Sequence, residues 1–222
     1  MHQQTAGAHS LGRYAYFKNN KSRYRMELDK RAINLWKKSE ISYRNFENYI
    51  SKKDDRFKLT IIDLFYVSNF KGGNATINEP ENEIKRKLNS YEDILKEIDD
   101  KFHGKYLHHT SEAELDELIF HSMRAIELTD KKSHNKIDGF SVSFLTTLLH
   151  FYFPNLFPIL DRRVLSGLGL LEKTDINSQK QVKNIGKFYP ELISIFKNKT
   201  KQMSIRELDR ELFVRTFQEF DQ

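Results

Sequence analysis

One carboxylate, Asp161, stands where a buried helix gives way to a new one, in the stretch 154-PNLFPILDRRV-164. It follows the apolar run 144-FLTTLLHFYF-153 and two prolines, and it is followed by Arg162 and Arg163. A carboxylate held among apolar neighbours can be placed there for chemistry. It can also cap the next helix, because Asp is a preferred N-cap residue that contributes about 0.5–2 kcal/mol. The two roles are compatible, and local sequence leaves both open.

The histidines do not form a metal-binding pattern. His108 and His109 are adjacent, so their side chains cannot easily share one ion, and no pair has the i, i+4 spacing of H-E-x-x-H. His150 lies on an apolar helix face, which indicates a core residue hydrogen-bonded to the backbone. The chain has no cysteine, which excludes disulfides, thiolate metal sites and cysteine nucleophiles. We therefore expect no metal and no other cofactor.

Two further patterns are better explained by structure than by chemistry. The stretch 69-NFKGGN-74 lacks G-x-x-x-x-G-K-[ST] and has no strand before it, so it predicts a helix stop and a turn. The acid pairs Asp54/Asp55 and Asp99/Asp100 fall at exposed helix ends. Capping and solvation explain them better than the converging carboxylates of a metal-dependent nuclease.

The elements that must position Asp161 are helical, because apolar residues recur mostly at helical spacing and the strand signal is weak. We expect an all-α, compact multi-helix domain over residues 26–222, after a weakly ordered basic lead-in at residues 1–25. The expected helices cover about 27–52, 55–68, a segment from Pro80, a segment from Ser90 to Phe102, a segment opened by a Ser111–Glu114 capping box, 140–153, a short segment from Asp161 to Gly167 or Gly169, 178–197 and 204–220.

The net charge of +6 and the pI of about 9.2 favour a polyanionic partner, of which nucleic acid is the commonest. A solvated basic surface explains the same charge equally well. No apolar run approaches the roughly 18–20 residues of a membrane span, and the first residues lack the apolar segment of a secretory signal. We expect a cytoplasmic protein with no membrane partner.

The order of segments resembles the helix-hairpin-helix DNA glycosylase superfamily, particularly the 8-oxoguanine DNA glycosylase-like fold of small bacterial members. The stretch 64-LFYVSN-69 looks like the turn that fills the hole left by a flipped base, with Ser68 and Asn69 at its tip. Residues 139–164 look like the second helix of the hairpin followed by the hinge that carries the catalytic aspartate. The stretch 204-SIRELDRELF-213 is similar to a closing helix of that family.

The sequence departs from the family's pattern in two places. The family's hairpin reads G-x-G, whereas only Gly139 is present here, followed by Phe140 and Ser141. Bifunctional members carry a lysine four residues after the first glycine, and Ser143 stands there instead. A hydroxyl cannot form the Schiff base that an amine forms. The resemblance therefore implies a monofunctional enzyme, unless a lysine elsewhere substitutes.

The resemblance implies a site and a reaction. Asp161 would stabilise the cationic sugar and orient the attacking water while the N-glycosidic bond of a flipped, modified base is hydrolysed. The implied partner is double-stranded DNA with a modified or mispaired base, bound by a monomer. The residues implied to contact DNA are Ser68, Asn69, Lys71, Gly139, Ser141, Ser143, Arg162 and Arg163. The aromatic side chains implied to line the base pocket are Phe151, Tyr152 and Phe157.

The same departures favour a rival interpretation. The chain could be a non-catalytic DNA-binding protein that keeps the fold, possibly in defence against phage. A third interpretation is a helical protein-interaction domain whose basic N-terminus is a tail. These readings differ in base release and in salt-dependent DNA binding.

Overall fold

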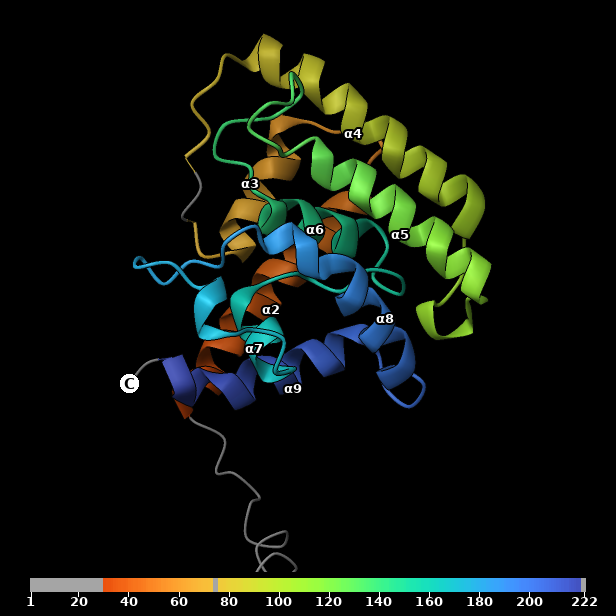
Figure 1. The fold of residues 1–222 in the computed structure, drawn as a ribbon. Coiled ribbons are helices and arrows are strands. Elements are labelled where there is room, and N and C mark those ends of the chain that lie inside the picture. Colours follow the sequence, from red (N-terminus) through yellow and green to blue (C-terminus); the bar gives the residue numbers. More distant parts are fainter. Residues whose placement is uncertain (1–29, 74–75, 221–222) are drawn as a thin grey trace, which may run out of the picture.

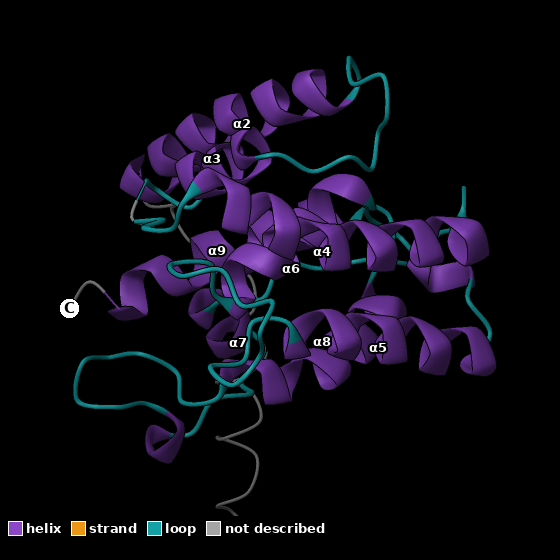
Figure 2. Ribbon diagram, turned by 90° about the horizontal axis from the view of Figure 1, so that it is seen from above, coloured by secondary structure: helices purple, strands orange, loops and turns teal. Residues whose placement is uncertain are grey.

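The regular elements of the described residues are helices, which confirms the all-α prediction. The computed structural model describes residues 30–73 and 76–220, so the predicted basic lead-in at residues 1–25 lies outside the described residues. Within that part, Figure 2 shows only helices and loops, and no helix is long and apolar enough to cross a membrane. The helices are α2 (Lys30–Ile50), α3 (Ile61–Phe70), α4 (Glu81–Phe102), α5 (Glu112–Glu127), α6 (Val142–Tyr152), α7 (Arg162–Gly167), α8 (Tyr189–Lys199) and α9 (Ile205–Phe220), with short 3-10 turns at Leu107–His109, Lys173–Asp175 and Ile185–Phe188.

The apolar helix α6 lies in the middle of the fold (Figure 1). All its residues from Leu145 to Tyr152 are buried, and α2, α3 and α5 pack against it. The long helices α4 and α5 lie side by side, α8 packs on α5, and α7 packs most extensively on α9. The predicted helix over 140–153 is thus confirmed, with Pro154 directly beyond its C-cap.

The hinge between α6 and α7 is fixed by hydrogen bonds to buried side chains. His150 Nδ1 donates to the carbonyl of Phe157 at 2.7 Å, and burial lowers the pKa of His150 to about 4. The Leu160 amide donates to Thr146 Oγ1 at 3.1 Å, and Tyr189 donates to the carbonyl of Pro158 at 3.0 Å. The predicted core role of His150 is confirmed, and the hinge delivers Asp161 in a defined position.

Helix α3 begins later than the predicted start at Asp54 or Asp55. Its N-cap is Thr60, whose side chain and that of Asp63 form a capping box. Glu92 of α4 accepts a hydrogen bond from the Leu59 amide at 2.9 Å, which holds the preceding chain outside the helix. The predicted stop is confirmed, because α3 ends at Phe70 and Gly72 and Gly73 follow with positive φ.

Two other predicted boundaries were wrong. No second helix starts at Ser90, because α4 runs without a break and its buried positions continue through that point at helical spacing. The helix predicted over 178–197 begins only at Tyr189, since left-handed backbone at Lys180 and Asn184 interrupts the segment and Pro190 suits a first turn. The Ser111–Glu114 capping box is confirmed in both of its hydrogen bonds.

Candidate functional site

Asp161 opens onto a cavity of about 540 Å³. We call it the Asp161 cavity. Its walls come from α2 between Leu35 and Ser42, the end of α3 between Asn69 and Gly72, the start of α7, and α9. A volume in this range is typical of small-molecule sites in proteins. The cavity therefore joins four elements that are far apart in the sequence.

The Asp161 carboxylate has one backbone and one side-chain partner. Its Oδ1 accepts a hydrogen bond from the Val164 amide at 2.9 Å, so Asp161 is the N-cap of α7. Its Oδ2 lies 3.5 Å from Lys71 Nζ at the end of α3. The side chain remains 26% exposed, and that of Lys71 17% exposed. The predicted N-cap is confirmed, and a carboxylate oxygen stays accessible from the cavity.

A second carboxylate, Asp209 of α9, lines the same cavity. Arg206 donates to its Oδ2 at 2.9 Å, and the same guanidinium lies 3.4 Å from Glu40 and 3.9 Å from the centre of the Trp36 ring. Burial raises the pKa of Asp209 to about 7; Arg206 opposes the rise and Asp161 adds to it. Two acids in one cavity thus have different environments.

Ser68 and Asn69, predicted at the tip of the turn that fills the hole left by a flipped base, differ in burial. Ser68 is buried within α3. Asn69 is exposed, lines the Asp161 cavity and donates to Ser42 Oγ at 3.0 Å. Because adjacent residues of a helix point in different directions, Ser68 and Asn69 face different sides of α3. Of the three residues predicted here to contact DNA, Asn69 and Lys71 line the cavity and Ser68 does not.

The two arginines after Asp161 point to different surroundings. The Arg163 guanidinium lies 4.8 Å from the centre of the Phe213 ring, and Arg163 lines the cavity. Arg162 donates to the carbonyl of Lys180 at 2.5 Å, toward the loop that precedes α8. Only Arg163 of this pair belongs to the cavity wall.

The residues predicted at the hairpin lie at the start of α6 and do not line the Asp161 cavity. Gly139 has φ +81°, and a Cβ there would come within 2.2 Å of the Thr76 carbonyl oxygen, so the turn requires glycine. Ser141 is the N-cap of α6 without a side-chain cap, and the Ser143 carbonyl accepts a hydrogen bond from Thr147 at 2.8 Å.

The three aromatic residues predicted for a base pocket belong to the core. Phe151 packs 4.4 Å, centre to centre, from Phe46 and is buried, as are Tyr152 and Phe157. None of the three lines the Asp161 cavity, because Phe151 and Tyr152 lie in the buried part of α6 and Phe157 is buried in the hinge that follows it. The aromatic walls of the cavity are Trp36, Phe70 and Phe213.

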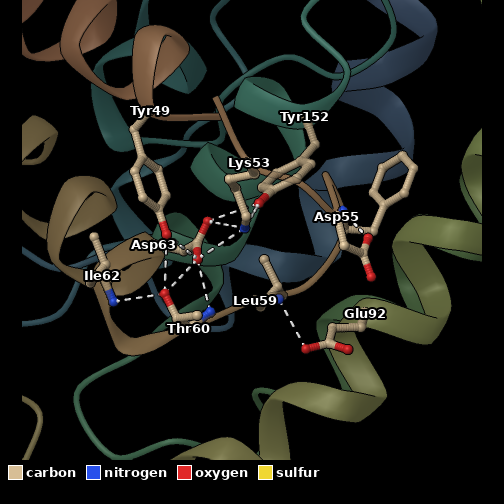
Figure 3. A network of polar contacts seen from close by, with 10 residues as sticks. Tyr49, Lys53, Asp55, Leu59, Thr60, Ile62, Asp63, Glu92 and Tyr152 are labelled. Atoms are coloured by element: carbon tan, nitrogen blue, oxygen red, sulfur yellow. Dashed lines mark hydrogen bonds and ion pairs between the residues drawn. The ribbon is translucent and has the colours of Figure 1, made fainter. Parts of the chain in front are cut away.

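Tyr152 instead belongs to a polar network around Asp63 (Figure 3). Asp63 accepts hydrogen bonds from Tyr152 at 2.8 Å, from Lys53 at 3.0 Å and from the Thr60 amide at 2.8 Å. The Asp63 side chain is 0% exposed and that of Lys53 9% exposed. Burial next to Asp63 raises the pKa of Tyr152 well above its ordinary value. This network fixes the start of α3 to α2 and α6.

Sequence reasoning missed Trp36, Arg206 and Asp209. A signal for the last two was present, since Arg206 and Asp209 are spaced i, i+3 on a helix, a spacing at which side chains meet. Trp36 is the only tryptophan of the chain, but its place on an amphipathic helix gave no sign of the cavity.

The chemistry available in the Asp161 cavity is that of acids, amines and aromatic faces. Within residues 30–73 and 76–220, no group of three or more histidine or acidic side chains could hold a metal ion. No protein-family model matches the chain, and no curated protein and no solved structure matches it either.

Proposed function

We propose that this protein is a DNA N-glycosylase without lyase activity, which hydrolyses the bond between deoxyribose and a modified base flipped out of duplex DNA. One observation carries the proposal: the Asp161 carboxylate is accessible in an aromatic-walled cavity, held by the Val164 amide and by Lys71. A base must leave the stack before such an enzyme can act on it, and it needs a cavity to enter.

Asp161 is suited to stabilise charge in this reaction. Its Oδ1 accepts a hydrogen bond from the Val164 amide, and its Oδ2 lies 3.5 Å from the Lys71 ammonium. As the bond from C1′ to the base nitrogen breaks, positive charge develops on the sugar. The carboxylate stabilises this charge, and it accepts a proton from the water that adds to C1′.

Lys71 lies beside the proposed reaction centre, at 3.5 Å from Asp161 Oδ2. A paired ammonium has no free electron pair, so it cannot attack C1′ in this state. Its charge instead suits a flanking phosphate of the flipped nucleotide. Hydrolysis by water therefore remains the proposed route.

The walls of the cavity fit a nucleobase. Trp36, Phe70 and Phe213 line the cavity with aromatic side chains, and base–aromatic stacking contributes about 1–3 kcal/mol per base. Asn69 is exposed at the same cavity, where its amide could replace the hydrogen bonds of the extruded base. Arg163 and Lys38 also line it and add positive charge toward the DNA backbone.

The test is release of a free base from a panel of duplexes, each with one modified base such as 8-oxoguanine, hypoxanthine, uracil or 7-methylguanine. Chromatography with mass detection measures the base in single-turnover reactions. We expect one or more bases to be released, and Asp161→Asn to reduce release at least about 100-fold while the Kd for DNA stays within about threefold. Asp116→Asn, at an exposed carboxylate of α5 outside the cavity, is the matched control and should keep full activity.

Other outcomes separate the rival interpretations. Full activity of Asp161→Asn would overturn the proposal. DNA binding with log K falling linearly against log salt, but with no base released, would favour a non-catalytic DNA-binding protein. An adduct trapped by borohydride, and lost in Lys71→Gln, would replace hydrolysis by an imine mechanism.

A further inference from the structure

We infer that Asp209 is a second catalytic residue, which donates a proton to the departing base while Asp161 stabilises the sugar. This inference rests on the proposed function. It adds that the substrate class is a neutral base, which leaves only slowly without a proton.

The two carboxylates lie in the walls of one cavity but on different elements. Asp161 begins α7 and Asp209 belongs to α9, and these two helices pack extensively on each other. The Asp209 side chain is 7% exposed, against 26% for Asp161. A base entering the Asp161 cavity would therefore meet a deeply placed acid as well as an accessible one.

The two oxygens of the Asp209 carboxyl differ in their contact with Arg206. Arg206 donates to Oδ2 at 2.9 Å, so Oδ1 is the oxygen that does not accept this hydrogen bond. Oδ1 is thus the oxygen that can carry a proton. The Arg206 guanidinium is fixed by ring faces, at 3.9 Å from Trp36, 4.7 Å from Tyr43 and 5.3 Å from Phe70.

The charged groups around Asp209 come from several elements. Arg206 lies on α9, and Glu40 on α2 contacts the same guanidinium. Lys71 directly follows α3, and Asp161 directly precedes α7. Lys38 of α2 and Arg163 of α7 line the same cavity. The resulting pKa of about 7 leaves a substantial protonated fraction at neutral pH. A carboxyl that is partly protonated at neutral pH can serve as a proton donor.

The step balances without any co-reactant other than water. The C1′–N bond breaks and its electron pair goes to the base, which takes the proton from Asp209. Water adds to C1′ and gives one proton to Asp161. Proton exchange with solvent then returns both carboxyls to their starting states, so that one water is consumed for each base released.

A structural role for Asp209 is the competing explanation, because it also holds Arg206 against Trp36. Glu40 offers the matched control. It contacts the same guanidinium at 3.4 Å but does not line the Asp161 cavity. If holding Arg206 were the whole role of Asp209, Glu40→Gln and Asp209→Asn would reduce base release to a similar degree.

The experiment measures single-turnover base release from pH 5 to 9 with two duplexes. One carries the neutral purine, 8-oxoguanine or hypoxanthine, that the enzyme releases; the other carries 7-methylguanine, whose positive ring needs no proton to leave. We expect Asp209→Asn to reduce release of the neutral purine about 100-fold and release of 7-methylguanine less than about threefold. Asp209→Glu should restore part of the loss, and Glu40→Gln should keep nearly full activity.

The pH profile of the unaltered protein decides the matter even if a variant fails to fold. Release of the neutral purine should fall about tenfold per pH unit above pH 7, and release of 7-methylguanine should not. Equal losses from both duplexes in Asp209→Asn, or a flat profile for the neutral purine, would overturn the role of Asp209 while leaving that of Asp161 intact. If no base is released at all, the proposed function fails, and the role of Asp209 fails with it.

Discussion

Asp63 and Asp209 are both buried aspartates with a cationic partner, yet they lie in opposite surroundings. Asp63 receives hydrogen bonds from Lys53, from two tyrosines and from both the amide and the hydroxyl of Thr60. Figure 3 shows these groups converging on one carboxylate. Asp209 accepts a hydrogen bond from Arg206, which also contacts Glu40, and the Asp161 carboxylate lies near enough to raise its pKa further.

The difference separates an acid that holds the fold from an acid suited to chemistry. A carboxylate whose lone pairs are all taken by donors has no orbital left for a substrate. A buried carboxylate that lines a cavity and has a raised pKa is less stable in its charged form and is placed for proton transfer. Four substitutions test how far this distinction holds, beginning with the largest expected change in stability.

Asp63→Ala should lower the free energy of unfolding by about 3–5 kcal/mol, because it leaves Lys53 as a buried charge without its partner. It also removes half of the capping box of α3. Urea unfolding followed by circular dichroism measures the change. Asp54→Ala, at an exposed neighbour, is the control and should stay within about 0.5 kcal/mol. A loss below 1 kcal/mol for Asp63→Ala would show that Asp63 does not stabilise the fold in the way that its hydrogen bonds indicate.

Asp209→Asn should stabilise the protein at pH 8, by an amount on the order of 2 kcal/mol. The carboxyl has a pKa of about 7 in the folded protein and 3.8 ordinarily, so ionisation opposes folding increasingly as pH rises from about 3.8 to 7. Below pH 3.8 the Asp209 carboxyl is protonated in both the folded and the unfolded state, so Asp209→Asn and the unaltered protein should have equal stability. Thermal melts at pH 4 and pH 8 give the two values. A variant that is less stable at pH 8 would show that Asp209 is a structural ion pair.

Arg206→Lys should cost about 1 kcal/mol, because an ammonium keeps the charge but loses the planar contact at 3.9 Å from Trp36. Urea titration at low and high salt measures it. Arg210→Lys, on an exposed face of α9, should cost almost nothing. Equal values for the two substitutions would mean that the aromatic contacts do not fix Arg206.

Asp161→Asn should change stability by less than about 0.5 kcal/mol, because Asn and Asp are comparable N-caps. Asp161→Ala should lose about 1 kcal/mol through the missing bond to the Val164 amide. The melting temperatures of the two variants separate the capping role from the catalytic role, because Asn keeps the N-cap but removes the negative charge. A large loss of stability in Asp161→Asn would mean that its reduced base release cannot be assigned to catalysis.

Much of the fold was predictable from the sequence where the signal was local. The Ser111–Glu114 capping box, the proline after α6 and the glycines after α3 depend on a few neighbouring residues, and their predicted positions were confirmed. The start of α3 has a local signal in the Thr60–Asp63 capping box, but the sequence does not show that Glu92 of another helix holds the Leu59 amide and keeps residues 54–59 outside the helix. Boundaries decided by such distant partners need the tertiary arrangement.

The site was predictable only in part for the same reason. Asp161 stood out because its apolar neighbours are adjacent in sequence, and the structure places Asn69, Lys71 and Arg163 in its cavity. The aromatic walls could not be chosen correctly, since all the aromatic residues of α6 look alike in sequence. Which ring faces a cavity depends on the packing of α2, α6 and α9 together.

Helix α3 connects the two regions compared above. Its first turn is anchored in the Asp63 network, and its last residues and the turn beyond them supply Asn69 and Lys71 to the Asp161 cavity. Ten helical residues span about 15 Å, and a helix is stiff over that length. A change at the anchored end of α3 should therefore displace Asn69 and Lys71 at the other end. We expect an unbiased genetic screen for inactivating substitutions to recover changes at Lys53 and Tyr152 as well as around Asp161.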